Sequence, residues 1–283
     1  MSIKSIVMIL VACPLAMTAQ EHYDRADSLF VVKALDDARA LPRTVNFPLH
    51  FARLFLGRPY VGHTLEVCDP EQLVVNTREL DCTTLVENVT ALTLCVYRHL
   101  YSWRDFLHAL LEMRYRNGQM EGYTSRLHYF SDWIEDNTRL ELVSEIQDPQ
   151  PPFSEVQTLD IHYMSRHPQA YRALKAHPDM VQVIADQEAA LTGKTYRYIP
   201  KKDVGDTKIM KNAVRDGDIL AITCHKDGLD IAHLGFAVWR KDGLHLLNAS
   251  QLHHKVVEEP MTLQQYLSKH PSHTGIRVVR IIK

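Results

Sequence analysis

The sequence is poor in cysteine, and its cysteines are not spaced as metal ligands. Five cysteines occur in 283 residues, and because no two of them form a Cys-x-x-Cys pair, a structural zinc site is not expected. The cysteines beyond the N-terminal segment are too scattered for a disulfide scaffold. If Cys82 stays reduced, at most one disulfide can form among Cys68, Cys95 and Cys224, and the sequence does not say which pair would form it.

The sequence also lacks an excess of charge of either sign. Its formal net charge is -2 and its isoelectric point is near 6.8, and it contains no run of like charges. A nucleic-acid partner is therefore not expected, and a neutral or mixed-charge substrate fits better. There is no glycine-rich phosphate loop, internal repeat or low-complexity tract. No cofactor is predicted.

The apolar run near the N-terminus is too short to span a membrane as a helix. Lys4 precedes apolar residues 6–17, which is the pattern of a secretory signal peptide. We predict a signal peptide over residues 1–19, cleavage after Ala19, and an exported, periplasmic protein without a transmembrane segment. A lipobox-like Leu-Val-Ala-Cys string ends at Cys13 and offers an alternative, in which a lipid on that cysteine anchors the chain.

The rest of the chain is predicted to be one α+β domain over residues 20–283. Its hydrophobic content of 46% is ample for a packed core. Helical spacing dominates about 24–200 and strand-like alternation dominates about 203–283. Helices are expected at 26–40, 47–56, 82–97, 103–114 and 125–134. Strands are expected at 64–67 and 73–76 and, as an antiparallel sheet or barrel in the last third, at 218–223, 233–239, 244–247, 255–257 and 276–282.

An Asp-Cys-Thr-Thr string at residues 81–84 leads from a polar turn into an apolar helical pattern. Asp81 can cap the helix, which makes Cys82 its first residue. Alternatively, Thr84 is the cap and forms a box with Glu87, which leaves the cysteine just outside the helix. In both cases Cys82 lies at the positive end of the helix dipole, which favours a thiolate. Free cysteines are also common as small core residues, so a nucleophilic role depends on its partners.

His233 is the histidine best placed to act with Cys82. It opens the strand 233–239, and strand alternation puts it on one face with Gly235 and Ala237, whose small size leaves room beside it. A nucleophilic cysteine, a histidine that acts as base and then as acid, and an amide that orients this histidine would together make a hydrolase site.

Asn248 is the first candidate for the orienting amide. A two-residue turn at residues 242 and 243 would, however, set Gln251 or Leu252 opposite His233 and leave Asn248 further along the strand. Asn248 therefore requires a longer loop or a bulge, and Gln251 is the second candidate.

Residues 125–134 combine aromatic rings with polar groups. One interpretation is a wall of a binding site, in which Tyr129 and Trp133 stack on a sugar ring while Arg126 contacts a carboxylate. The other interpretation is a core stripe whose polar groups point outward.

Several strings together resemble the NlpC-type papain-like hydrolases of bacterial cell walls, and they lie at residues 57–62 (Gly-Arg-Pro-Tyr-Val-Gly), 81–87, 233–235 and 248–250. The resemblance implies a papain-like fold with an N-terminal nucleophile helix, a sheet in the last third and extra helical insertions. It implies Cys82 as nucleophile, His233 as base and Asn248 as third member. It also implies that Tyr60 assists at the oxyanion site, beside the backbone amide of Cys82. Asp-Cys-Thr-Thr replaces the Asp-Cys-Ser-Gly usual in that family.

Residues 81–87 and 123–133 are similar to a narrower branch, the N-acetylmuramoyl-L-alanine amidases that act on 1,6-anhydro-muropeptides in wall recycling. This resemblance implies a muropeptide substrate, cleaved at the amide between muramic acid and L-alanine. The sequence is also compatible with three other functions. These are an endopeptidase that cuts within the stem peptide, a zinc amidase that uses His225, Asp230 and His233, and a wall-binding module without catalytic activity.

Overall fold

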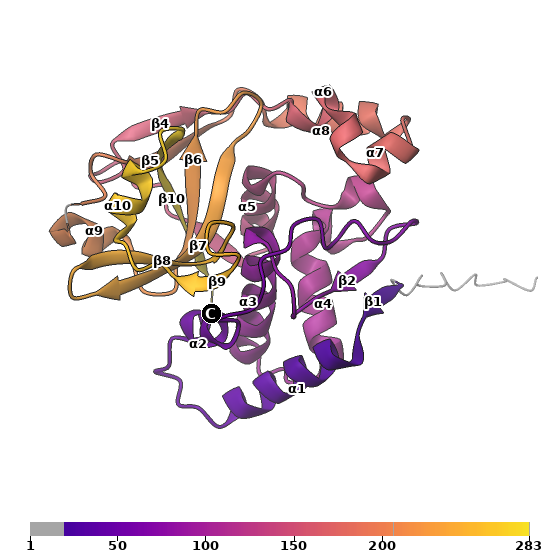
Figure 1. Cartoon of the computed structure of the whole chain (residues 1–283), viewed down its shortest axis with the longest axis horizontal. Coiled ribbons are helices and arrows are strands. Elements are labelled where there is room, and N and C mark those ends of the chain that lie inside the picture. The colour runs from indigo at the N-terminus through magenta and orange to yellow at the C-terminus, as the bar shows by residue number, and fades with distance from the viewer. Residues whose placement is uncertain (1–19, 206, 283) are drawn as a thin grey trace, which may run out of the picture.

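The computed structural model describes residues 20–205 and 207–282. The predicted signal peptide and Cys13 lie outside the described residues. A layer of helices packs against one face of a twisted sheet, and the helix that begins at Cys82 contacts both this sheet and neighbouring helices of the layer (Figure 1). Within the described residues, no helix has the length and apolar character needed to cross a membrane.

Local sequence signals account for the starts of the first helices. Asp24, Asn46 and Ser102 each accept a hydrogen bond from a backbone N–H in the first turn of the helix that follows, which satisfies donors that the helix itself leaves unpaired. The N-terminal half contains α1 (Arg25–Arg39), α2 (Phe47–Leu54), α3 (Cys82–Tyr97), α4 (Trp103–Arg114) and α5 (Phe130–Arg139). The later helices are α6 (Tyr163–Arg166), α7 (Arg172–Ala176), α8 (Met180–Leu191), α9 (Thr207–Ala213) and α10 (Leu263–Ser268).

The described residues form an 8-stranded sheet, in which every strand pair is antiparallel. Along it the order is β4-β5-β10-β6-β7-β8-β9, and β3 pairs with β10. Its strands are β3 (Val143–Glu145), β4 (Glu155–Thr158), β5 (Thr195–Pro200), β6 (Ile219–Cys224), β7 (Ile231–Arg240), β8 (Gly243–Ser250), β9 (Lys255–Glu258) and β10 (His273–Ile281). A separate parallel pair joins β1 (Glu21–Tyr23) to β2 (Leu73–Val75).

Both faces of the central strands are buried, and side chains alternate between them. Leu234 and Phe236 of β7 belong to the core shared with α3, whereas Ala237 belongs to a second core that contains Leu263 and Leu267 of α10. This alternation places His233 on the α10 side of the sheet. The predicted antiparallel sheet in the last third is confirmed, and it also takes β3, β4 and β5 from the part predicted to be helical.

Two predicted elements are wrong. Residues 64–67 form turns and no strand. The helix predicted at 125–134 is divided into a short 3-10 turn, Tyr123–Ser125, and α5, which begins only at Phe130. Between them Arg126 is extended and forms a β-bridge with Tyr115, so a tertiary contact overrides the helical pattern.

Candidate active site

Asp81 is the N-cap of α3 and makes Cys82 the first residue of the helix. The Thr84 N–H donates to Asp81 Oδ1 over 2.8 Å, and the Asp81 N–H donates to Thr84 Oγ1 over 2.9 Å. The first of the two capping predictions is therefore correct. Glu87 has no part in the cap and is buried further along the helix.

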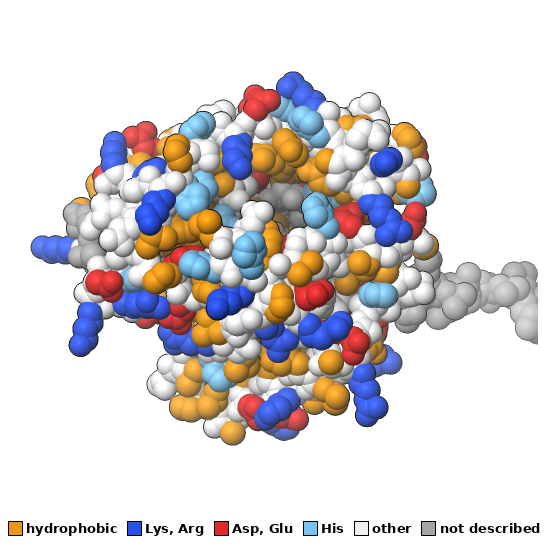
Figure 2. Space-filling view, in the orientation of Figure 1, with side chains coloured by type: hydrophobic (Ala, Val, Ile, Leu, Met, Phe, Trp, Pro, Cys, Tyr) orange, Lys and Arg blue, Asp and Glu red, His pale blue; other side chains and the backbone are white. Residues whose placement is uncertain are grey.

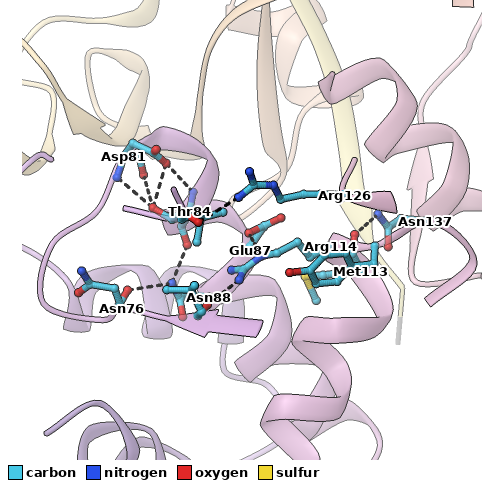
Figure 3. Close-up of polar contacts among 12 residues, drawn as sticks. Asn76, Asp81, Thr84, Glu87, Asn88, Met113, Arg114, Arg126 and Asn137 are labelled. Atoms are coloured by element: carbon cyan, nitrogen blue, oxygen red, sulfur yellow. Dashed lines mark hydrogen bonds and ion pairs between the residues drawn. The ribbon is translucent and has the colours of Figure 1, made fainter. Parts of the chain in front are cut away.

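Buried polar contacts fix the start of α3 against its neighbours (Figure 3). Arg114 Nε of α4 donates to Glu87 Oε2 over 2.8 Å, and Arg114 Nη1 donates to the Val74 carbonyl over 2.5 Å. Asn88 Nδ2 donates to the Thr84 carbonyl over 2.8 Å. Because these groups are all buried, Cys82 sits on a helix end with little freedom to move.

The segment that precedes α3 brings Tyr60 to the same place. The Tyr60 N–H donates to the His254 carbonyl, and the Val61 N–H donates to the Leu80 carbonyl, each over 3.0 Å. The segment thereby lies between the residues before β9 and the start of α3. Burial, together with the nearby Cys82 and Asp81, raises the pKa of Tyr60 to about 12. Its hydroxyl is therefore neutral and able to donate at pH 7.

The structure brings Asn248 to His233. Asn248 Oδ1 lies 2.9 Å from His233 Nε2. The hairpin turn comprises residues 241 and 242, because Arg240 pairs with Gly243 and Phe236 pairs with Leu247. The predicted turn at residues 242 and 243 is wrong by one residue. Continuing this register places Asn248 across from Gly235, diagonal to His233, and diagonal neighbours are within reach of long side chains.

Gln251, the second candidate, is exposed in the turn after β8. Among the hydrogen bonds of the described residues, none joins Gln251 to His233. No bulge or long loop is needed for Asn248 to reach His233, because a diagonal contact replaces the direct one.

Gly235 lies on the strand between His233 and Ala237, at a point where a larger side chain has no room. A Cβ atom at residue 235 would lie 2.7 Å from the Leu247 carbonyl oxygen and 2.7 Å from Leu246 Cδ1. We expect Gly235→Ala to lower the free energy of unfolding by about 1–3 kcal/mol, because the backbone oxygen cannot move aside freely. Urea unfolding measures this. Gly62→Ala, with nothing within 4 Å of the added carbon, is the control, and equal stability of the two variants would contradict the prediction.

Cys82 lies directly beside the strand that carries His233. The Leu234 N–H hydrogen-bonds to the Cys82 sulfur. Burial raises the pKa of Cys82 to about 12, with a further increase from Asp81, and outweighs the lowering by the Leu234 and Thr83 groups. Burial also lowers the pKa of His233. The raised pKa of Cys82 disfavours the thiolate predicted from the helix dipole. The thiol lies beside the strand that carries His233, whose lowered pKa leaves a neutral imidazole able to accept a proton.

A hollow of about 310 Å³ opens beside Cys82. His128 is one of its lining residues, and burial together with Arg126 lowers the pKa of His128 to about 3. His128 is therefore neutral, and its Nε2 lies 3.0 Å from the Tyr123 carbonyl. The hollow is lined by Tyr60, Gly62, His63, Leu65, Glu66, Asp81, Cys82, Thr83, Glu87, Arg126, Leu127 and His128.

The predicted sugar-binding wall is wrong for both aromatic residues. Trp133 is 1% exposed and stacks on Phe130 with ring centroids 4.8 Å apart. Tyr129 is also buried, and its hydroxyl donates to Glu188 and accepts from the Met164 N–H. These rings belong to the interior, because α5 begins at residue 130 and turns its aromatic face inward.

Arg126 is a buried cation that lines the hollow. It donates to a Glu66 carboxylate oxygen, and its Nε lies 3.6 Å from Glu71 Oε1. The prediction that Arg126 is available for a substrate carboxylate therefore needs correction, since two carboxylates of the chain already neutralise it.

The residues of the zinc alternative do not form a cluster. Asp230 accepts a hydrogen bond from the Ser131 N–H, and His225 is exposed. Across residues 20–205 and 207–282, no group of three or more His, Cys, Asp or Glu side chains is arranged to hold a metal ion. The cysteines described there, at positions 68, 82, 95 and 224, are all free thiols.

Three side chains near the site were not predicted. Glu259 is buried behind Asn248, Tyr266 stacks near His233 with ring centroids 6.4 Å apart, and His128 lines the hollow. His128 lies within residues 123–133, the segment that resembles the amidase branch, so the sequence pointed to its neighbourhood. Glu259 lies in a Glu-Glu-Pro string with no recognisable pattern.

Comparison with known proteins assigns the family. The family model described as AmiA-like, N-acetylmuramoyl-L-alanine amidase-like, matches residues 50–276. The chain belongs to this family. The match spans both halves of the site, from the Tyr60 segment to β10, and no curated protein matches the chain.

Solved structures agree with this assignment. An N-acetylmuramoyl-L-alanine amidase from Bacteroides uniformis ATCC 8492 is 41% identical, with a TM-score of 0.79, over 84% of this chain and 98% of that one. A Bacteroides fragilis protein named as a candidate xylanase is 42% identical, with a TM-score of 0.77, over 82% and 100% of the two chains. A Legionella pneumophila protein, 21% identical with a TM-score of 0.67 over 91% and 96%, shares the fold.

Proposed function

We propose that this family member is a cysteine N-acetylmuramoyl-L-alanine amidase with a papain-like catalytic arrangement, in which Cys82 is the nucleophile, His233 the base and Asn248 the residue that orients His233. The observation that carries the proposal is the contact of 2.9 Å between His233 Nε2 and Asn248 Oδ1. Leu234, the residue after His233 on the same strand, hydrogen-bonds to the Cys82 sulfur through its N–H. Family membership supplies the class of bond that is cleaved.

The reaction proceeds through a thioester. His233 takes the thiol proton as the sulfur attacks the lactyl carbonyl of muramic acid, and a tetrahedral intermediate forms. The C–N bond then breaks, and His233 returns the proton to the departing amine of L-alanine. Water attacks the thioester with His233 again as base, the C–S bond breaks, and the lactyl carboxylate and the free thiol are released. No metal or other cofactor takes part in these steps.

Two neutral hydrogen-bond donors support an oxyanion site next to Cys82. The backbone N–H of Cys82, as the first residue of α3, has no acceptor within the helix. Tyr60 keeps its proton at neutral pH because its pKa is raised. Together these two donors would stabilise the charge that develops on the carbonyl oxygen.

The substrate assignment follows the family and the earlier resemblance. We propose muropeptides that end in 1,6-anhydro-N-acetylmuramic acid as the substrates, with wall turnover or recycling as the process. The hollow beside Cys82 would hold the part of the substrate next to the cleaved amide. The signal-peptide pattern supports export to the periplasm, either as a soluble protein or anchored through Cys13.

One digestion tests this function. The purified protein is incubated with defined muropeptides carrying an anhydro or a reducing muramic acid end, and the products are identified by mass spectrometry. We expect a free peptide that begins with L-alanine and a sugar that ends in a lactyl carboxylate, formed faster from the anhydro substrate. Cleavage within the stem peptide would instead indicate an endopeptidase, and the absence of any cleavage would favour a binding module.

A further inference from the structure

A buried carboxylate lies directly behind the His233–Asn248 pair. Glu259 follows β9 and is 0% exposed. Asn248 Nδ2 donates to Glu259 Oε1 over 3.3 Å, and His253 Nε2 lies 3.2 Å from Glu259 Oε2. The Glu259 backbone carbonyl is held in turn by His245 Nδ1 at 2.9 Å. The carboxylate is thus fixed on both oxygens and at its main chain.

The position of Glu259 determines which way the Asn248 amide faces. An ionised carboxylate only accepts hydrogen bonds, so the NH2 end of Asn248 must point to Glu259. The carbonyl oxygen of Asn248 must then point to His233, and it can only accept. His233 Nε2 must therefore carry the proton, which leaves the lone pair on Nδ1. This is the nitrogen left to exchange a proton with Cys82.

The charge of Glu259 also acts on His233. Glu259 raises the pKa of His233, and burial, which is the larger effect, lowers it. The negative charge of Glu259, one side chain away through Asn248, stabilises the imidazolium that forms when His233 takes the thiol proton. The other titratable groups around His233 are Asp81 before α3, Tyr266 of α10, His270 after α10, and His273 of β10. Cys82 lies near Tyr266.

We propose that Glu259 is a positioning residue of the site, which sets the tautomer of His233 through the Asn248 amide and stabilises the His233 imidazolium. Glu259 touches neither the substrate nor the reacting sulfur. This inference rests on the proposed Cys82–His233 mechanism, although it is independent of which muropeptide is cleaved.

Alkylation of Cys82 by iodoacetamide tests the proposal without any substrate. The rate is followed from pH 5 to 9 by mass spectrometry of the peptide that carries Cys82, so the other cysteines do not interfere. We expect Glu259→Gln to slow alkylation at neutral pH by about tenfold. We also expect the acid limb of the profile to move to lower pH, because His233 loses a negative neighbour and binds its proton less tightly.

The matched control is Glu258→Gln. Glu258 precedes Glu259, but its carboxylate pairs with Arg53 and Arg240, each over 2.7 Å. This variant should leave both the rate and the acid limb unchanged. Glu259→Asp, which keeps the charge, should keep the acid limb near its wild-type position even if alkylation is slower.

Three results would overturn the proposal. One is an unchanged acid limb in Glu259→Gln, which would indicate a merely structural role. Another is an equal effect in Glu258→Gln. The third needs only wild-type protein: nitrogen-15 NMR, with His233 assigned by comparison with His233→Gln, should find the proton on Nε2, and a proton on Nδ1 would contradict the inference. Failure of muropeptide cleavage with these results intact would refute only the proposed substrate.

Discussion

Cys82→Ala is expected to abolish the proposed muropeptide cleavage, with a loss of at least about 10⁴-fold in turnover. The reason is that Cys82 is the nucleophile of the proposed mechanism, and a base with an orienting amide does little without a nucleophile. The measurement is initial rate against a defined anhydro-muropeptide, followed by separation of the products. The fold should remain, because Cys82 is only partly buried and its side chain is small.

Cys68→Ala is the control for this experiment. Cys68 is also a partly buried free thiol, but it lines a different hollow, together with Arg172 and His177. Its replacement should leave turnover within about twofold of wild type. Turnover by Cys82→Ala at a rate close to that of the Cys68 variant would refute the cysteine mechanism.

Arg114→Ala is expected to lower the free energy of unfolding by about 3–5 kcal/mol, more than any other single substitution predicted for this protein. The substitution leaves Glu87 as an uncompensated charge in the interior, where both partners are about 2% exposed. It also removes the donor to the Val74 carbonyl. Burial already raises the pKa of Glu87 despite the attraction of Arg114, so removal of the cation makes ionisation of Glu87 still less favourable. Urea unfolding measures the effect.

A second ion pair between the same two helices provides the control. Arg98 follows α3 and donates to Glu112 of α4 over 2.7 Å, but both side chains are partly exposed. Arg98→Ala should cost less than about 1 kcal/mol, because water screens an exposed pair. The double substitution Glu87→Gln, Arg114→Met should recover part of the loss, since no isolated charge remains. A loss as small in Arg114→Ala as in Arg98→Ala would contradict the prediction.

The elements predicted correctly are those that local signals define. The expected helices near residues 26–40, 47–56, 82–97 and 103–114 are confirmed, because capping side chains and apolar spacing are written in adjacent residues. The strands of the last third are also confirmed, because the alternation that predicts them is likewise a property of adjacent residues. The wrong helix at 125–134 had a helical pattern, but a bridge to Tyr115 and ion pairs with Glu66 and Glu71 hold Arg126 extended.

The candidate site also contains residues that local patterns predict and residues whose position only tertiary packing decides. A helix-start cysteine and a strand histidine beside small residues are visible as patterns, and the structure places Cys82 beside Leu234, the residue that follows His233. The fates of Tyr129 and Trp133 were not visible, because an aromatic stripe looks alike whether it faces the core or a ligand. Only packing distinguishes the two, and here it buries both rings.

The sequence by itself determined that a helix begins close to Cys82, that His233 lies on a strand, and that the chain resembles cell-wall cysteine hydrolases. These properties depend on residues close together in the chain. The tertiary structure alone decided that Asn248 and not Gln251 reaches His233, that Glu259 lies behind them, and that burial raises the pKa of the Cys82 thiol. Hairpin register depends on the exact position of the turn, and a shift of one residue changes every cross-strand neighbour. Desolvation depends on packing between distant segments, which no local pattern encodes.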